Sequence, residues 1–216
     1  MVVGEIYHIF TRSIANFRIF HNDSDFNRIQ QLIQYYQIDN NLKFSDYIIQ
    51  ETVQKQGFNN SFKVTSKDKK KLVQIIAYCL MPTHIHLILK QLNKKGISDY
   101  IRRILNSYSS YFNTKHKRKG PLWESRFQSV RIENDEQLLH LTRYLHLNPV
   151  TASLIKNPED WSFSSYKEYL FEVESIQGIC KFDDLMEIRP LSYRNFVNNQ
   201  ISYQKELAKL KKMIID

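Results

Sequence analysis

Two histidines, His84 and His86, lie two positions apart in the otherwise apolar stretch YCLMPTHIHLILK, residues 78–90. Residues two apart in a β-strand face the same side, so both imidazoles project from one face. The alternate positions face the other, buried side: Ile85, Leu87 and Leu89. A His-x-His pair on a strand suits metal coordination, but it also occurs as two core histidines with hydrogen-bonded rings. A metal site needs further ligands, and the pair alone leaves both interpretations open.

A candidate for a further ligand lies in TRYLHLNPV, residues 142–150. Tyr144 and Asn148 are four apart, so on a helix they share a face. The amide oxygen of Asn148 could complete a three-ligand site with the two imidazoles, leaving positions open for a substrate oxygen. The hydroxyl of Tyr144 would then lie one turn away, near the metal. On spacing alone, the favoured interpretation of Tyr144 is one more core aromatic among 13 tyrosines.

The elements that must position these residues follow from the hydrophobic patterns. Residues 5–13 alternate and predict a strand, and the apolar spacing of residues 24–37 predicts a helix capped by Ser24. Residues 38–70 are polar and irregular, and the charge run SKDKKK at their end is expected to be a solvated loop. Residues 71–80 and 84–90 predict two strands joined in a hairpin by the turn MPT.

The second half of the chain continues the pattern. An apolar stripe predicts an amphipathic helix over 97–119 that ends in a basic cluster, and residues 121–133 predict a return to the sheet as a strand. Asn134 and Gln137 form a capping-box signal for a helix that begins at 135. This helix is expected to stop near Leu147 because of Pro149. The fold class is therefore α+β, built around an antiparallel sheet.

Composition narrows the class of protein. The 216 residues carry a net charge of +9 with a pI of about 9.4, which favours an anionic partner such as nucleic acid. The two cysteines, Cys79 and Cys180, exclude a disulfide framework and a paired-cysteine metal site. The N-terminus lacks a secretion-signal pattern, and no apolar run approaches the roughly 20 residues needed to cross a bilayer. A cytoplasmic protein with no membrane partner is expected.

Three segments in order, AYCLMPTHIHLILK, GPLWESRFQSVRIENDEQLLHLTRYLHLNPVTASLI and NPEDWSFSSYKEYL, resemble the single-tyrosine HUH transposases. The helix ending in LNPV is most similar to the REP-associated tyrosine transposases. The resemblance covers roughly residues 5–170. It implies an antiparallel sheet of RRM/ferredoxin-like topology flanked by helices. We expect a catalytic domain over 1–170 and a helical C-terminal extension over 171–216, docked on the domain or on DNA.

The same resemblance implies the chemistry. His84, His86 and Asn148 would bind a divalent metal, Mg²⁺ or Mn²⁺, and Tyr144 would be the nucleophile. The protein would be an endonuclease and strand transferase on single-stranded DNA, acting through a covalent 5′-phosphotyrosine intermediate. The implied partner is a DNA hairpin with flanking bases, bound by a monomer or a homodimer that shares its active sites.

Basic residues between the two catalytic segments are the candidates for contacts to DNA phosphates: Lys115, Lys117, Arg118, Lys119 and Arg126. Trp123 suits stacking on a base and a place in the core about equally well. His140 and His146 are expected to be solvent-facing bystanders.

Three other functions are compatible with parts of the pattern. A non-catalytic nucleic-acid-binding module of the same fold explains the charge and the aromatics, but not the histidine pair together with Tyr144 and Asn148. A two-histidine phosphodiesterase needs two His-x-Ser/Thr motifs, and only HLT at 140–142 fits. A zinc-stabilised structural protein predicts that chelation unfolds the chain.

Overall fold

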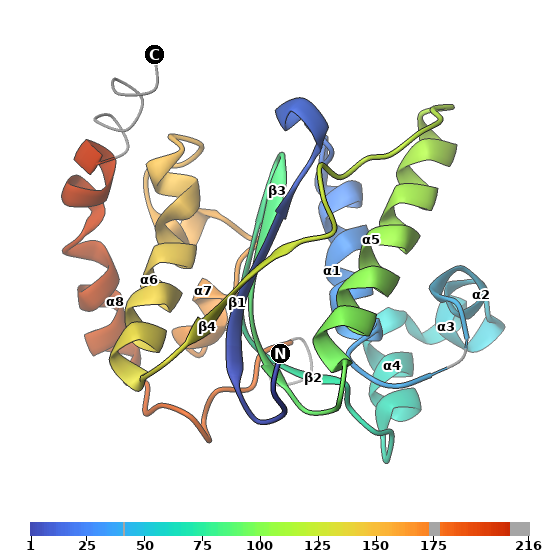
Figure 1. The fold of residues 1–216 in the computed structure, drawn as a ribbon, viewed down its shortest axis with the longest axis horizontal. Helices are drawn as coiled ribbons and strands as arrows, with labels where there is room; N and C mark the ends of the chain where they lie inside the picture. The colour runs from blue at the N-terminus through green and yellow to red at the C-terminus, as the bar shows by residue number, and fades with distance from the viewer. Residues whose placement is uncertain (41, 173–177, 208–216) are drawn as a thin grey trace.

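The computed structural model describes residues 1–40, 42–172 and 178–207. Its centre is a four-stranded antiparallel sheet with the spatial order β2-β3-β1-β4 (Figure 1). The strands are β1 (Ile6–Arg12), β2 (Val73–Met81), β3 (His84–Gln91) and β4 (Gln128–Ile132). With one helix crossing between β1 and β2 and another between β3 and β4, this is the βαββαβ arrangement of ferredoxin-like folds. The predicted fold class is confirmed.

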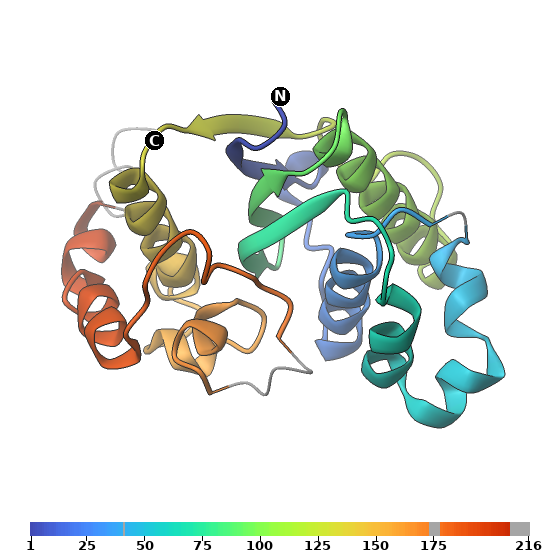
Figure 2. The same cartoon turned by 90° about the horizontal axis from the view of Figure 1, so that it is seen from below.

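Helices cover both faces of the sheet in three layers, as Figures 1 and 2 show. One face carries α1 (Asp23–Tyr35) and α5 (Gly96–Lys115). The other carries α6 (Asp135–Thr151), with α7 (Tyr166–Tyr169) and α8 (Pro190–Asn198) beside it. The described residues also form two short 3-10 turns, η1 (Ile14–Asn16) after β1 and η2 (Pro158–Asp160) after α6.

The alternation of side chains along the strands divides the core in two. Ile85, Leu87 and Leu89 belong to the apolar cluster under α1 and α5. Ile88 and Cys79 belong to the second cluster, under α6 and α7. The histidines of β3 alternate with the first set, so they face the α6 side.

Residues 38–70 are the largest departure from the sequence-based expectation. They form three short helices, α2 (Phe44–Ile48), α3 (Glu51–Gln56) and α4 (Phe58–Ser66). Buried aromatic residues at 44, 47 and 62 pack on Tyr35 of α1, and buried Phe58 packs on those three. The expectation of an irregular segment was wrong because these widely spaced aromatics supply the apolar anchors that the polar composition conceals. Residues 67–70 of the charge run form an exposed turn after α4, as expected.

The helix α6 runs through Pro149 to Thr151, so the predicted stop near Leu147 was wrong. Proline at this position removes one hydrogen bond, to the carbonyl of Leu145. The last turn is still closed by bonds from Ala152 N to Asn148 O (2.9 Å) and from Leu154 N to Pro149 O (2.9 Å). Burial of Leu145, Leu147 and Val150 on either side holds the segment in place.

Other boundaries differ by less. Asn22, not Ser24, caps α1, since its side chain accepts a hydrogen bond from Asp25 N. The helix α5 ends at Lys115, and the strand expected over 121–133 is confined to Gln128–Ile132.

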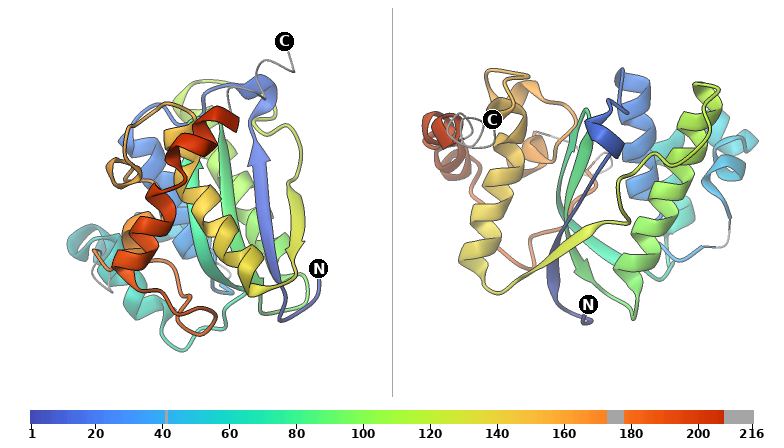
Figure 3. Two further views of the ribbon diagram at one scale, coloured as in Figure 1. Left: turned by 90° about the vertical axis from the view of Figure 1, so that its left-hand side faces the viewer. Right: turned by 45° about the horizontal axis from the view of Figure 1, so that its top comes forward.

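The C-terminal extension packs α8 beside α6, as the left view of Figure 3 shows. A further helical segment covers residues 201–207, and residues 208–216 of the expected helical extension lie outside the described residues. Within the described part of the chain, no helix is long and apolar enough to span a bilayer.

Candidate active site

His84 and His86 lie at the beginning of β3, one of the two central strands of the sheet. Their rings are perpendicular, with centroids 5.1 Å apart. His86 is buried and His84 is half-buried. Both project toward α6, which supplies the tyrosine.

Tyr144 on α6 meets His86 edge-on, with ring centroids 6.0 Å apart and planes at 87°. Its side chain is 40% exposed, so it is not an interior core aromatic. Burial raises the pKa of Tyr144, with a contribution from nearby Cys79, while the side chain of Asn148 lowers it. The structure thus brings the predicted nucleophile and both predicted imidazoles to one place.

These three side chains open on a pocket of about 310 Å³. The pocket has lining residues that the sequence reasoning missed: His8, Phe10, Thr11, Arg12, Asn16 and Thr83. The antiparallel register pairs Phe10 with His86 and Arg12 with His84. The alternation in residues 5–13 was the available signal, since it places His8, Phe10 and Arg12 on one face of that strand.

Each imidazole of the pair has its Nδ1 engaged by a neighbour. His86 Nδ1 lies 3.0 Å from His8 Nε2, and His84 Nδ1 lies 2.9 Å from Thr83 Oγ1. Among the described residues, neither Nε2 has a hydrogen-bond partner. Metal-bound histidines characteristically use one nitrogen for the metal and donate the other N–H to an orienting group. The arrangement therefore fits two Nε2 ligands, each oriented by a neighbour at its Nδ1.

The electrostatics of the pocket keep the rings neutral. Burial lowers the pKa of His8 to about 4, and burial together with the charge of Arg12 lowers the pKa of His84 to about 4. The pKa of His86 is lowered well below its usual value by burial and by its two histidine neighbours. Neutral imidazoles have the free lone pairs that a metal ion requires.

Asn148 lies one turn after Tyr144 and does not line the histidine pocket. Its Nδ2 is buried without a hydrogen-bond partner, and its side chain reaches the hydroxyl of Tyr144. Rotation of this amide about its terminal bond would exchange the orphaned nitrogen for the oxygen that a metal prefers. Among the described residues, there is no cluster of three or more His, Cys, Asp or Glu side chains suited to a metal ion.

The basic candidates are not equivalent. Lys115 is paired with the buried carboxylate of Asp25 at 2.6 Å, and Arg118 donates to Asn113 and to the carbonyl oxygens of Gly120 and Pro121. Lys117, Lys119 and Arg126 are exposed.

Trp123 is half-buried, packs on Tyr108 and donates its indole N–H to Leu105 O. This anchors the loop and leaves less of the ring available for stacking on a base. The segment around Trp123 pairs with Ser13, whose N–H bonds to Thr83 O at 2.9 Å. The loop that carries these residues therefore reaches the histidine end of the sheet.

His146 was predicted to face solvent and is instead fully buried. Its Nδ1 lies 2.7 Å from Tyr193 Oη and its Nε2 lies 2.8 Å from Ser165 Oγ. The partners come from α8 and from the residue before α7, so the sequence offered no local signal for this burial. His140 is exposed, as expected.

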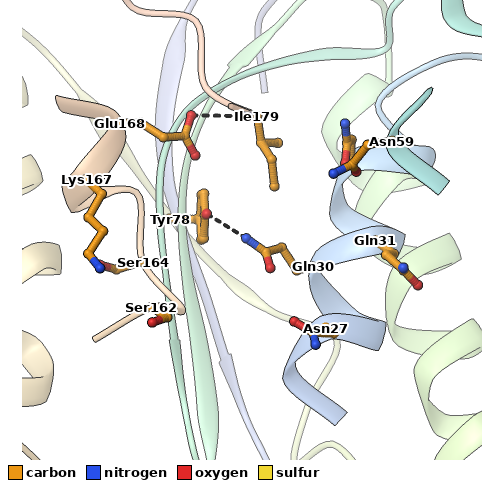
Figure 4. A pocket seen from close by; sticks show the side chains of 11 residues that line it. Asn27, Gln30, Gln31, Asn59, Tyr78, Ser162, Ser164, Lys167, Glu168 and Ile179 are labelled. Carbon is orange, nitrogen blue, oxygen red and sulfur yellow. Dashed lines mark hydrogen bonds between the residues drawn. The ribbon is translucent and has the colours of Figure 1, made fainter. Parts of the chain in front are cut away.

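A second pocket, of about 320 Å³, lies at the outer edge of β2 (Figure 4). Gln30 donates to Tyr78 Oη at 2.8 Å, and Glu168 accepts from the N–H of Ile179 at 2.8 Å. These bonds tie α1, β2 and the segment after α7 together. The described residues that line this pocket include no histidine, and Tyr78 is deep in the core, so the histidine pocket remains the candidate site.

Comparison with known proteins agrees with this geometry. A REP-associated tyrosine transposase of Escherichia coli is 25% identical over 118 residues, 53% of this chain and 66% of the relative. A putative REP-associated tyrosine transposase of Haemophilus influenzae is 28% identical over 120 residues, 50% of this chain and 66% of the relative. Each match spans just under two thirds of the relative's length.

A solved structure of a REP-associated tyrosine transposase bound to a REP hairpin shares the fold, with a TM-score of 0.53 and 16% identity. The superposition covers 87% of this chain and 94% of that one. The profile described as "Transposase IS200 like" matches residues 35–148, which include both histidines, Tyr144 and Asn148. The chain therefore belongs to the IS200-like transposase family.

Proposed function

We propose that this protein is a transposase of the REP-associated tyrosine type that cuts and rejoins single-stranded DNA through a covalent bond to Tyr144. The observation that carries the proposal is the edge-on contact between the rings of Tyr144 and His86 above one pocket. Three segments distant in the sequence converge there, and the position of Tyr144 on the rim leaves its hydroxyl accessible to a phosphodiester.

In the cleavage step, Tyr144 Oη forms a bond to phosphorus and the bond from phosphorus to the 3′ oxygen breaks. The phenol proton passes to water, and a proton from water neutralises the departing oxygen as a 3′-hydroxyl. The product is a 5′-phosphotyrosine. Attack by a 3′-hydroxyl on that linkage reverses the chemistry and joins strands without ATP, because the phosphodiester energy is conserved.

The residues around Tyr144 prepare this step. His84 and His86, neutral and oriented through Thr83 and His8, would hold a divalent metal through their Nε2 atoms, with Asn148 as the third ligand. A bound Mg²⁺ or Mn²⁺ would polarise the phosphate and offset charge in the transition state. Arg12 lines the same pocket and adds a permanent positive charge that attracts the phosphate.

The proposed substrate is a DNA hairpin with a single-stranded flank. The solved relative is a complex with a REP hairpin, and the net charge of +9 here supports an anionic partner. The flank would enter the histidine pocket, which is large enough for a backbone phosphate with its sugar.

The test is formation of a covalent adduct. A fluorescent hairpin oligonucleotide from the flanks of the gene is incubated with the protein and Mn²⁺, and adducts that survive denaturation are resolved on a gel. Tyr144→Phe should abolish the adduct and retain DNA binding. Tyr203→Phe, at another exposed tyrosine (55% exposed), is the matched control and should leave the adduct unchanged.

The same assay separates the rival functions. DNA binding by the unsubstituted protein with no adduct under any metal condition would point to a non-catalytic binding module. An adduct that persists in Tyr144→Phe would place the nucleophile elsewhere. Chelation should remove the adduct and leave the thermal unfolding midpoint nearly unchanged, whereas a zinc-stabilised structural protein would unfold.

A further inference from the structure

The outer surface of α5 is unusually poor in acidic residues for an exposed helix. Of its twenty residues, only Asp99 in the first turn is acidic. The exposed and half-buried positions beyond that turn carry arginine, lysine, asparagine, serine, threonine and one tyrosine. Surface helices usually intersperse charges of both signs, so this composition indicates a face that meets an anion.

This face is hollowed. A groove of about 660 Å³ runs between α5 and the chain before α2, with Arg28, Lys43, Arg102, Arg103 and Lys115 as its cations. A second hollow of about 530 Å³ continues it past the end of α5 and adds Lys117, Arg118 and Lys119. The two share Ser110 and Thr114, so they form one continuous depression, here called the α5 groove.

The charge of the α5 groove is positive after its ion pairs are counted. Eight cations line it, and no acidic side chain is among its described lining residues. Three cations are paired with carboxylates from outside the lining: Lys115 with Asp25, Arg103 with Asp39 and Arg102 with Asp99. Subtracting three from eight leaves a balance of +5.

Arg28 is a cation of the α5 groove that packs between aromatic rings. Its guanidinium lies 4.4 Å from the ring centre of Phe44 and 5.1 Å from that of Tyr111. It makes no ion pair with any described carboxylate. Burial lowers its pKa, but an arginine remains charged.

The polar side chains along α5 are spaced to follow a phosphate backbone. Arg103, Ser107, Ser110 and Thr114 recur about one helical turn apart and extend over roughly 16 Å at 1.5 Å per residue. Hydroxyl and arginine side chains of this kind are common donors to DNA phosphates. Because they sit on a rigid helix, their positions are fixed before a ligand arrives.

The lining favours duplex over single-stranded DNA. Single-strand sites expose aromatic rings on which bases stack. Here Tyr36 is buried, and the ring of Tyr111 is covered by Arg28 and Lys115 while its hydroxyl bonds to Asp25. The groove therefore offers contacts to phosphates and none to the faces of bases.

From these observations we infer that the α5 groove binds the phosphate backbone of the double-stranded stem of a DNA hairpin. This rests on the proposed function only for the identity of the DNA as a hairpin. The helix α5 lies across the sheet from α6 (Figure 1), and the basic end of its groove continues into the loop that reaches Ser13 and Thr83. A stem on α5 would thus direct its flank around the end of the sheet toward the histidine pocket.

The test compares two probes by fluorescence anisotropy: a hairpin with a single-stranded flank and the same flank without the stem. Phosphate contacts are independent of sequence, so an arbitrary stem is a valid probe. Ser110→Asp places a negative charge where the two hollows join, on an exposed helical position. It should weaken hairpin binding about tenfold or more because a charge-assisted hydrogen bond is removed and repulsion is added, with little effect on the stemless flank. Ser192→Asp on α8, an exposed helical serine outside the groove, is the matched control.

A second measurement uses the salt dependence of hairpin binding. The double variant Lys43→Gln/Arg102→Gln should reduce the slope of log affinity against log salt by roughly 0.9 for each duplex phosphate that the protein no longer neutralises. The inference would be overturned if Ser110→Asp weakened binding of both probes equally. It would also be overturned if the variants bound the hairpin with the same affinity and the same salt slope as the unsubstituted protein. Failure of the Tyr144 chemistry is a separate result, because it appears as a missing adduct while stem-dependent binding persists.

Discussion

The phenol ring of Tyr144 stands perpendicular to the imidazole of His86, which in turn hydrogen-bonds through Nδ1 to His8. The orientation of the proposed metal ligand therefore depends on His8, a residue of β1 that also lines the histidine pocket. His8 also stacks on His86, with ring centroids 5.2 Å apart. It is a positioning residue in this arrangement.

Replacing His8 with Phe keeps a flat ring for stacking and removes the hydrogen bond. Loss of such an orienting partner typically lowers metal affinity about 10- to 100-fold. The dependence of adduct formation on Mn²⁺ concentration should shift by that factor, with the rate largely restored at saturating metal. His140→Gln, at an exposed histidine, serves as the control. An unchanged Mn²⁺ dependence in His8→Phe would show that His86 is oriented by other contacts.

We propose two separable roles for Asn148, as a metal ligand and as the neighbour that lowers the pKa of Tyr144. Its side chain lowers the pKa of Tyr144, opposing the effect of burial. Asn148→Ala should therefore weaken Mn²⁺ binding, measured by calorimetry, and move the alkaline rise of adduct formation to higher pH. If the pH profile shifts but the calorimetric affinity for Mn²⁺ is unchanged, Asn148 affects the pKa of Tyr144 and is not a metal ligand.

The sequence predicts correctly that His84 and His86 project from one face of the sheet, because the alternation of side chains along a strand is a local property. It does not predict the role of His8, since its contact with His86 depends on the register between β1 and β3, which pairs Phe10 with His86. The helix end predicted from Pro149 was wrong for a related reason. Proline in a helix costs free energy locally, but the burial of Leu145, Leu147 and Val150 stabilises the helix by more than that cost.

The misassigned segments have a common cause. The aromatic residues within 38–70 stabilise helices there because they pack on Tyr35, and this contact cannot be predicted from the segment alone. Likewise, His146 is buried by α8, an element from the extension for which no motif was recognised. Both depend on contacts between separate elements, which composition and periodicity do not encode.

Tyr193 connects the C-terminal extension to the tyrosine helix. Its hydroxyl donates to Thr142 Oγ1 at 2.9 Å and lies 2.7 Å from His146 Nδ1, all within the buried interface of α6 and α8. Tyr193→Phe preserves the ring and leaves buried partners unsatisfied, so it should lower the free energy of unfolding by about 1–3 kcal/mol. Urea denaturation measures this, with Tyr203→Phe as an exposed control. No loss of stability would mean that the hydroxyl bonds are replaced by other partners.

The burial of His146 makes stability depend on pH. Burial lowers its pKa from 6.5 to about 3 in the folded chain. Below pH 6.5 the unfolded chain therefore takes up a proton that the folded chain does not, so the contribution is fully present above pH 6.5. It is lost progressively as the pH falls from 6.5 toward 3.

His146→Gln cannot titrate and isolates this one group from the other buried histidines. The variant should be less stable at pH 7.5, but the difference from the unsubstituted protein should shrink by up to about 1.4 kcal/mol per pH unit below 6.5. Urea denaturation at intervals between pH 7.5 and pH 5 gives both curves. Parallel curves through that range would mean that His146 keeps the same pKa in the folded and unfolded chains, contrary to its enclosure between Tyr193 and Ser165.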